Sequence, residues 1–224
     1  MTDATPVVYV VDDDESIRKC LDRMLRFAGY RTETFASAEE FLRRHRAAVP
    51  GCLILDVQMP GRSGLELQQL LHDGDVPLPV VFLTGHGDIP MTVRAMRGGA
   101  VDFLTKPFVR DDLLAAVRRA VELAADDRAG RDEVAAVRRR ADGLTEREQE
   151  VMILVVSGML NKRIGHRLGV TEKTVKFHRG NVMHKMGADS LAGLVRMAEK
   201  IGIRGEAPGR ATASGARAAV GCCG

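Results

Sequence analysis

The sequence lacks any apolar run long enough to cross a membrane as a helix. No stretch approaches the roughly 20 apolar residues that such a helix needs. The N-terminal segment MTDATP has neither the basic start nor the apolar stretch of a secretion signal. We therefore expect a cytoplasmic protein that has no membrane partner.

The four cysteines do not form a disulfide or zinc framework. Cys20 lies in a predicted helix, Cys52 opens a predicted buried strand, and Cys222 and Cys223 are adjacent near the C-terminus. No CxxC pair and no nearby histidine spacing indicates a zinc site. We interpret them as two core thiols and two tail thiols, which fits a reducing compartment.

Charge is divided unevenly along the 224 residues, a length with room for one large or two modest domains. Residues 1–124 carry 15 Lys/Arg against 18 Asp/Glu, residues 125–142 carry five of each, and residues 143–204 carry 11 against 6. An acidic first half joined to a small basic module predicts two functions, and we expect the basic module to bind a polyanion.

Residues 1–124 alternate between β-rich runs and helical patterns. The predicted strands are 7–11, 31–35, 52–55, 79–83 and 101–104, and the predicted helices are 16–28, 37–46, 64–73, 90–98 and 110–125. This alternation predicts an α/β fold with a five-stranded parallel, doubly wound sheet covered on both faces. The alternating run RTETF at 31–35 is expected nearer an edge, and the more apolar runs at 7–11, 52–55 and 79–83 are expected at the centre.

The rest of the chain is predicted to be helical or without fixed structure. Residues 125–142 are charged and alanine-rich, and we expect a helical linker that is interrupted near Gly130. Residues 143–204 show helical patterns separated by glycine turns, which predicts a second, all-α domain. Residues 205–224 are small and have no periodic apolar face, so we expect a disordered tail.

Polar side chains stand at the ends of four of the predicted strands. Asp12 and Asp13 follow the first strand and Asp56 follows the third, while Thr84 and Lys106 close the fourth and fifth. In an open parallel sheet these ends meet at one rim, where function gathers. Acidic residues also occur simply as favourable charges at a helix start, but the five residues together indicate a site.

The residue types at this rim point to phosphoryl transfer. Three carboxylates in one crevice suit a hard divalent cation, and Mg²⁺ takes few protein oxygens. Asp56 is the candidate nucleophile, because a carboxylate can attack phosphorus and become an acyl phosphate. Such a transfer needs positioning and charge neutralisation, which Mg²⁺, the Lys106 ammonium and the Thr84 hydroxyl would supply.

Residues 6–124 resemble a response-regulator receiver domain. The motifs that carry the resemblance are VVDDDE, LILDVQMPGRSGLEL, VVFLTGHGD and AVDFLTKPF, and TGHGDIPMTVRAMRGGAVDFLTKPF is similar to the FixJ-like subgroup. The resemblance implies that a sensor histidine kinase phosphorylates Asp56. It also implies that Asp13, Asp56 and the Gln58 backbone carbonyl bind Mg²⁺ directly, while Asp12 acts through water.

The same resemblance implies a switch and a dimer. Thr84 would move toward the phosphoryl oxygens and Phe103 would turn inward behind it, although a plain core aromatic would have the same sequence pattern as Phe103. The moved surface, about residues 90–106, would pair two copies of the chain on phosphorylation. A cis peptide bond between Lys106 and Pro107 is also implied.

The basic module contains two helices joined by a short glycine turn, which is the helix-turn-helix pattern. In the second helix, predicted over 171–186, helical periodicity turns Val175, Val182 and Met186 toward the core. It turns the following residues outward: Lys173, Lys176, Phe177, Gly180, Asn181 and His184. An ordinary solvated face is one interpretation. The cations, the amide and an exposed aromatic that can touch a thymine methyl favour a helix in the DNA major groove.

Residues 143–204 resemble a LuxR-type DNA-binding domain through LTEREQEV, GMLNKRIGHRLGV, TEKTVKFHRGNVMHKM and LVRMA. The resemblance implies a four-helix module whose third helix reads double-stranded promoter DNA and whose last helix, about 190–201, pairs two copies. Lys176, Phe177 and Gly180 match positions that commonly approach bases, and Gly180 departs from the side-chain-bearing residues often found there. The positions that commonly touch phosphate are matched by Lys173, Thr174, Asn181 and Lys185.

These patterns together predict a phosphorylation-controlled transcriptional regulator rather than an enzyme, with self-phosphorylation and slow self-dephosphorylation at Asp56 as its only chemistry. Its partners would be a histidine kinase, promoter DNA, RNA polymerase and a second copy of the chain. One alternative is a constitutive DNA-binding protein whose receiver is a dimerisation scaffold. A weaker alternative is a Mg²⁺-dependent phosphatase with an Asp nucleophile. Such enzymes usually carry a DxD pair, where this sequence has Asp56 and Gln58.

Overall fold

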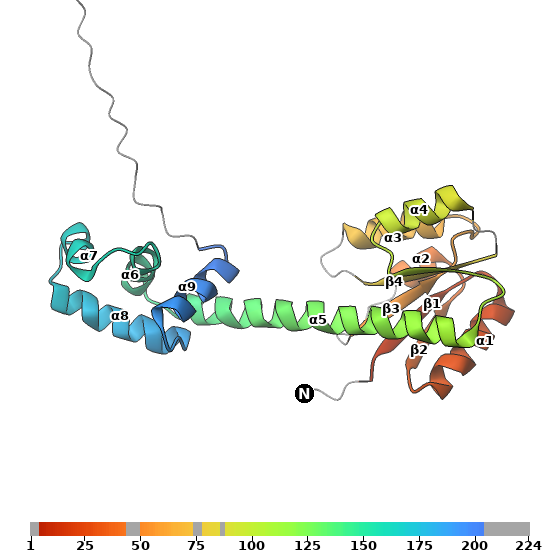
Figure 1. Ribbon diagram of the computed structural model, residues 1–224, viewed down its shortest axis with the longest axis horizontal. Coiled ribbons are helices and arrows are strands. Elements are labelled where there is room, and N and C mark those ends of the chain that lie inside the picture. Colours follow the sequence, from red (N-terminus) through yellow and green to blue (C-terminus); the bar gives the residue numbers. More distant parts are fainter. Residues whose placement is uncertain (1–4, 44–49, 74–77, 86–87, 204–224) are drawn as a thin grey trace, which may run out of the picture. The chain divides into compact units, whose positions relative to one another are not determined.

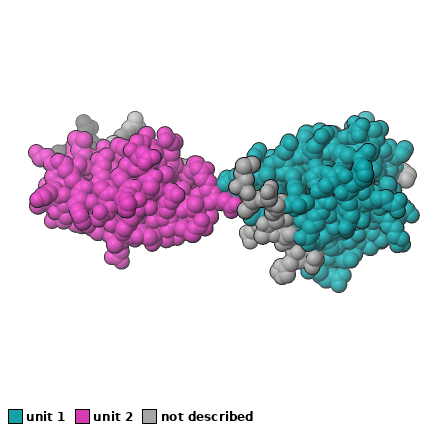
Figure 2. All heavy atoms as spheres, turned by 90° about the horizontal axis from the view of Figure 1, so that it is seen from below, with its two compact units in different colours: residues 1–131 teal, residues 132–224 magenta. Residues whose placement is uncertain are grey.

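The chain divides into two compact units, residues 1–131 and residues 132–224, which Figure 2 colours teal and magenta. The boundary falls inside the segment predicted as the linker, 125–142. The computed structural model describes residues 5–43, 50–73, 78–85 and 88–203. The predicted tail and the last residues of the predicted helix 37–46 lie outside the described residues.

The first unit alternates strands and helices in the predicted order (Figure 1). Its strands are β1 (Val7–Val11), β2 (Arg31–Phe35), β3 (Gly51–Leu55), β4 (Val80–Thr84) and β5 (Asp102–Thr105). Its helices are α1 (Glu15–Phe27), α2 (Ala38–Arg43), α3 (Gly64–His72), α4 (Ile89–Arg97) and the beginning of α5 (Arg110–Asp142).

The strands form one parallel sheet in the order β2-β1-β3-β4-β5. Every residue of β1, β3 and β4 is buried, whereas β2 alternates between exposed and buried positions. A strand in the middle of a covered sheet has apolar neighbours on both faces, so its sequence is apolar throughout. The structure therefore confirms the predicted central strands and the predicted edge position of 31–35.

Helices cover both faces of this sheet (Figure 1). One face packs against α1 and α5, through Leu21, Leu25, Leu113 and Val117. The other face packs against α2, α3 and α4, through Phe41, Leu67, Leu71 and Ala95. The predicted α/β, doubly wound architecture is therefore confirmed. Cys52 is buried in the first of these cores, as expected, whereas Cys20 on α1 is exposed, so the expectation that it is a core thiol is wrong.

Helix α5 runs from Arg110 to Asp142 without a break, so the predicted interruption near Gly130 is wrong. Its beginning contributes Leu113 and Val117 to one core of the first unit, and its end contributes Val137 and Ala141 to the core of the second unit. A glycine in a helix interior costs about 1 kcal/mol relative to alanine. Apolar burial at both ends of the helix offsets a cost of that size.

The second unit is all-α, and its helices are α6 (Glu146–Val156), α7 (Asn161–Leu168), α8 (Glu172–Met186) and α9 (Leu191–Lys200), after the end of α5. The αL conformation of Gly169 (φ 67°) ends α7 and turns the chain toward α8. Thr171 caps α8, and the buried residues Val175, Val182 and Met186 confirm its predicted core face. Among the described residues, no helix has the length and apolar character needed to span a membrane.

Candidate functional site

The register of the sheet brings the predicted polar residues to one edge. Val11 lies opposite Leu55, so Asp12 and Asp56, which follow them, emerge side by side from β1 and β3. Thr84 pairs with Thr105 at the ends of β4 and β5, so Lys106 emerges at the same edge. The sequence places these residues far apart, and the parallel topology alone gathers them.

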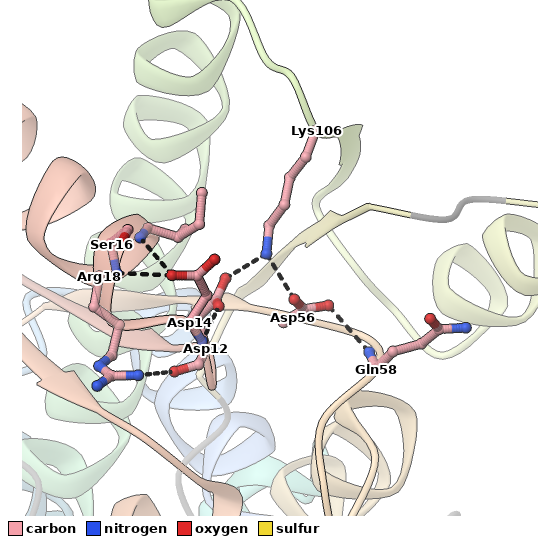
Figure 3. Close-up of polar contacts among 8 residues, drawn as sticks. Asp12, Asp14, Ser16, Arg18, Asp56, Gln58 and Lys106 are labelled. Atoms are coloured by element: carbon pink, nitrogen blue, oxygen red, sulfur yellow. Dashed lines mark hydrogen bonds and ion pairs between the residues drawn. The ribbon is translucent and has the colours of Figure 1, made fainter.

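Lys106 lies between the two buried carboxylates (Figure 3). Its Nζ is 2.6 Å from Oδ2 of Asp12 and 2.6 Å from Oδ2 of Asp56. Asp12 is 2% exposed and Asp56 is 7% exposed. Buried carboxylates are costly unless a cation or hydrogen bonds compensate them, so this ammonium compensates both charges.

Burial and pairing act against each other in the pKa values of this cluster. Burial raises the pKa of Asp12, and the hydrogen bond from Lys106 opposes the rise without cancelling it. Burial alone would lower the pKa of Lys106, but the carboxylates of Asp12 and Asp56 outweigh it and raise that pKa. Lys106 is therefore held as an ammonium ion at neutral pH.

Three carboxylates converge at this edge in an arrangement that suits a metal ion. Oxygen atoms of Asp12, Asp13 and Asp56 all lie within 4.8 Å of one another, and Asp13 is exposed. A set of carboxylate oxygens with one side open to water is the donor set that Mg²⁺ prefers. The residues present therefore fit the divalent cation that the sequence predicts.

Backbone groups fix the orientation of the two buried carboxylates (Figure 3). The Gln58 backbone N–H donates to Oδ1 of Asp56 at 3.0 Å, and the Asp14 backbone N–H donates to Oδ1 of Asp12 at 2.9 Å. Asp14 itself caps α1 by accepting from the Ser16 backbone N–H at 2.7 Å. The carboxylate that follows the site is thus a helix cap rather than a fourth member of it.

The two predicted switch residues lie behind this cluster. Thr84 is fully buried at the end of β4, and its carbonyl accepts a 2.7 Å hydrogen bond from the Lys106 backbone N–H. Phe103 in β5 is partly buried, and its ring centroid lies 6.1 Å from that of Phe82. The Lys106–Pro107 peptide bond is cis, as the resemblance implied.

One residue near the carboxylates, Arg18, is not indicated by any motif in the sequence. Its Nη1 donates to the carbonyl oxygen of Asp12 at 2.6 Å (Figure 3). Arg18 lies in α1, beyond the DDDE run, and an arginine on an amphipathic helix carries no signal of such a contact. The orientation of α1, which begins after its Asp14 cap, brings Arg18 back to the strand end.

A second group of predicted residues lies on α8 in the other unit. Lys173, Lys176, Phe177 and Gly180 are exposed, and Asn181 is partly buried. The partly buried Thr174 instead closes the start of the helix, because its backbone N–H donates to Oγ1 of Thr171 at 3.2 Å. Lys173, Lys176, Phe177 and Gly180 follow one another at spacings of three, one and three residues, so these exposed residues share one face of α8.

Lys185 already has a partner within the chain. Its Nζ lies 2.6 Å from Oε2 of the buried Glu148, which also accepts the Thr145 backbone N–H at 2.9 Å. The hydrogen bonds from Lys185 and then from the Thr145 backbone lower the pKa of Glu148 to about 2. Lys185, predicted as a phosphate contact, thus also ties the end of α8 to the start of α6.

Comparison with known protein families matches both units. Residues 8–118 match the response regulator receiver domain, and residues 142–198 match the luxR family of bacterial regulatory proteins. The fold and these matches together define a receiver domain followed by a LuxR-type DNA-binding domain.

Individual relatives cover nearly the whole chain. Nodulation protein W of Bradyrhizobium diazoefficiens is 48% identical over 88% of this chain and 87% of its own length. The transcriptional regulatory protein FixJ of Rhizobium meliloti is 44% identical over 88% of this chain and 96% of its own length. The low-resolution structure of the response regulator StyR has a TM-score of 0.78 and 48% identity, covering 88% of this chain and all of that one.

The chain therefore belongs to the two-component response regulators that join a receiver domain to a LuxR-type DNA-binding domain. Its relatives are transcriptional regulators, which agrees with the predicted non-enzymatic role. The two domains imply a kinase and DNA as partners.

Proposed function

We propose that Asp56 accepts a phosphoryl group from a sensor histidine kinase and that this modification controls binding of promoter DNA. The observation that carries the proposal is the Lys106 ammonium, 2.6 Å from both Asp12 and Asp56. A half-buried cation held between two carboxylates at a strand end is positioned to neutralise an incoming phosphoryl oxygen. Since promoter DNA is the target, we expect the protein to act in the cytoplasm.

The transfer follows from the geometry of this edge. A carboxylate oxygen of Asp56 forms a bond to phosphorus while the bond from phosphorus to the kinase imidazole nitrogen breaks, and that nitrogen keeps the electron pair. Lys106 then turns from the carboxylate toward the phosphoryl oxygens. We propose that Asp13, Asp56 and the Gln58 carbonyl hold Mg²⁺ directly and that Asp12 holds it through water. The metal would supply neutralisation of the developing charge. The same residues allow self-phosphorylation by a small donor and slow self-dephosphorylation.

We propose that phosphorylation is passed to the α4–β5 surface through Thr84 and Phe103. The exposed side of α4 carries Ile89, Val93 and Met96, which are 81%, 41% and 44% exposed. Their spacing of four and three residues aligns them as one apolar stripe. Such a stripe beside the edge strand β5 supports pairing with a second copy of the chain through about residues 90–106.

A groove along α1 supports a docking place for the kinase. It has a volume of about 650 Å³ and extends from Ser16, near the acid site, to Phe27. Phe27 is 83% exposed, and the guanidinium of Arg110 lies 5.5 Å from its ring centroid. We expect Phe27→Asp to slow transfer from a kinase that phosphorylates the wild-type chain, while phosphorylation by acetyl phosphate stays unchanged. Equal slowing with both donors would contradict docking in this groove.

We propose that α8 reads promoter DNA, with Lys173, Lys176, Phe177, Gly180 and Asn181 on the contact surface. Phosphate contacts supply affinity and base contacts supply sequence preference. The paired domains would present two such helices to a roughly symmetric site, where α9 contributes to pairing. The bound dimer would then act on RNA polymerase.

Sedimentation of the purified chain with Mg²⁺, before and after acetyl phosphate, tests the switch. We expect a donor-dependent shift from monomer to dimer that Asp56→Asn abolishes. Val93→Glu should prevent the shift, whereas Leu42→Glu, a control of similar exposure (39%) on α2, should leave it intact. A chain that is dimeric without donor would instead support the scaffold alternative, and sustained turnover of phosphate esters would support the phosphatase.

A further inference from the structure

Gly180 lies in the middle of α8, on a surface that is exposed to solvent. Its backbone is helical, and no hydrogen bond or turn requires a glycine there. Glycine is the least favourable helix residue apart from proline, because it loses the most conformational freedom on folding. A glycine at this position is therefore explained either by close packing within the chain or by close contact with a binding partner.

Packing within the chain does not explain this glycine. A Cβ atom added at Gly165 in α7 would lie 2.7 Å from the carbonyl oxygen of Val170, so Gly165 is needed for the turn between α7 and α8. A Cβ atom added at Gly180 would meet, apart from its chain neighbours and the adjacent backbone of α8, no heavy atom of the described chain within 4 Å. The space that a side chain would occupy at Gly180 is open.

The side chains around this open space favour contact with DNA. Lys176, Phe177 and His184 lie four residues before, three residues before and four residues after Gly180, so they surround it on the helix surface. All three are exposed, and Phe177 is 65% exposed. Gly130 in α5 also has open space around it but has no such group of cationic and aromatic neighbours, so openness alone does not mark a contact.

Phe177 has a defined position beside the open space. Its ring centroid lies 5.7 Å from that of His178, with an edge-on angle of 67°. An exposed phenylalanine with one aromatic neighbour keeps most of its apolar surface available. The sole acid of α8, Glu172, lies at its start, where Lys176 pairs with it at 3.1 Å, so the middle of the helix presents no negative charge to a polyanion.

Duplex DNA offers one kind of apolar group to such a surface, the C5 methyl of thymine in the major groove. A helix position without a side chain lets the backbone approach the base edges closely. The neighbouring aromatic ring can then cover the methyl from one side. We propose that Gly180 and Phe177 together form a notch that selects thymine by its methyl group. This inference rests on the proposed reading of DNA by α8 and names the chemical group that the helix reads.

The test uses the full chain and a duplex that it selects itself from a randomised pool, with Mg²⁺ and acetyl phosphate present. Each thymine of the selected duplex is then replaced by deoxyuridine, which differs only by the missing methyl. We expect at least one replacement in each half-site to weaken binding roughly fivefold or more. Phe177→Ala should weaken binding to the thymine duplex similarly and remove the difference between the two duplexes.

Gly180→Ala adds only the Cβ atom that the notch excludes. Alanine favours the helix, so we expect an unchanged or higher Tm together with severalfold weaker binding. Gly130→Ala, at the other open helical glycine, and Ile153→Ala, at an exposed apolar residue on α6, serve as controls and should bind normally.

The possible results separate the notch from the function on which it rests. If the wild-type chain enriches no duplex, the proposed DNA binding fails and the notch fails with it. If a duplex is enriched but every uracil replacement binds as well as thymine, DNA binding stands and the notch is wrong. Wild-type affinity in Gly180→Ala would also overturn it.

Discussion

The two units build their functional residues in opposite ways. In the receiver, Asp12 and Asp56 are nearly fully buried, and Lys106 is hydrogen-bonded to both. On α8 of the DNA-binding domain, Phe177 is 65% exposed and no side chain occupies the space at Gly180. In the first arrangement the buried charges are compensated within the chain, whereas in the second the exposed ring of Phe177 and the open space at Gly180 remain available to a ligand.

Because the two sites differ in burial, substitutions affect them in different ways. A site of buried charges depends on compensation, so removing one member leaves another uncompensated. A recognition surface depends on exposed side chains, whose removal changes binding and leaves stability nearly unchanged. Substitutions in the receiver site should therefore change phosphorylation, and substitutions on the exposed face of α8 should change DNA affinity.

The largest expected effect is at the phosphoacceptor. Asp56→Asn replaces the nucleophilic carboxylate with an amide of the same shape, so phosphorylation by acetyl phosphate should disappear. Intact-protein mass spectrometry would measure the added phosphoryl group. Asp14→Asn, which keeps a good helix cap at an exposed position, should be phosphorylated normally. A phosphoryl group on the Asp56→Asn chain would refute the site.

Removal of the Lys106 ammonium should have the next largest effect. Lys106→Ala leaves Asp12 and Asp56 without their shared partner, so we expect phosphorylation by acetyl phosphate to slow roughly a hundredfold. The rate is measured by intact-protein mass spectrometry on samples quenched at successive times. Lys19→Ala removes an exposed lysine that is paired with Glu15 within α1, and it should react at the wild-type rate. Equal rates for all three chains would count against the role of Lys106.

Two residues of α8 allow a buried position to be compared with an exposed one within a single helix. Val175 is fully buried and Phe177 is exposed. Val175→Ala should destabilise the second unit by about 2 kcal/mol, and Phe177→Ala should leave its stability nearly unchanged. Thermal unfolding followed by calorimetry distinguishes them, with phosphorylation of the receiver as a check that the first unit is intact. Equal loss of stability in both variants would mean that Phe177 is a packing residue.

Loss of the exposed lysines should have a smaller and salt-dependent effect. Lys173→Ala, at a predicted phosphate contact, should weaken DNA binding severalfold and reduce the salt dependence of log K by about one. Lys176→Ala, at a predicted base contact, should weaken binding and relax the sequence preference. Fluorescence anisotropy at several salt concentrations measures both quantities. Lys19→Ala, at an exposed lysine of α1 in the first unit that is paired with Glu15, is the matched control. An unchanged salt slope in Lys173→Ala would exclude a phosphate contact there.

The smallest expected effect concerns Glu148, a buried residue of the second unit that contributes to stability and not to the DNA-contact face. Its pKa of about 2 lies below the ordinary value of 4.5, because Lys185 and the Thr145 backbone stabilise the carboxylate. The folded state therefore gains stability above pH 4.5, and this gain is lost as pH falls from about 4.5 toward 2. Glu148→Gln should lower the Tm at pH 7 by a few degrees and should weaken the pH dependence within that window. A wild-type pH profile in Glu148→Gln would contradict this pairing.

Sequence alone predicted most of the receiver site, for a physical reason. Each of its residues follows a short apolar strand, and a parallel sheet brings such positions together whatever the distance along the chain. Arg18 was missed because its contact depends on how α1 is oriented, which no spacing in the sequence specifies.

The second half was less predictable because its decisive contacts join helices. The pairing of Lys185 with Glu148 links residues 37 positions apart across α8 and α6, so the sequence, which predicts Lys185 as a phosphate contact, did not indicate this ion pair. The continuity of α5 through Gly130 was also missed, since local propensity favours a break and the buried residues at the two ends of the helix oppose it. The exposed face of α8, by contrast, followed from helical periodicity.

The most direct test of the central claim is the affinity of the full chain for its selected duplex, measured by anisotropy with Mg²⁺, with and without acetyl phosphate. The account predicts that the donor tightens binding at least severalfold for the wild-type chain and has no effect on Asp56→Asn. Equal affinity under all four conditions would contradict it, and the receiver would then be a scaffold for a constitutive DNA-binding protein.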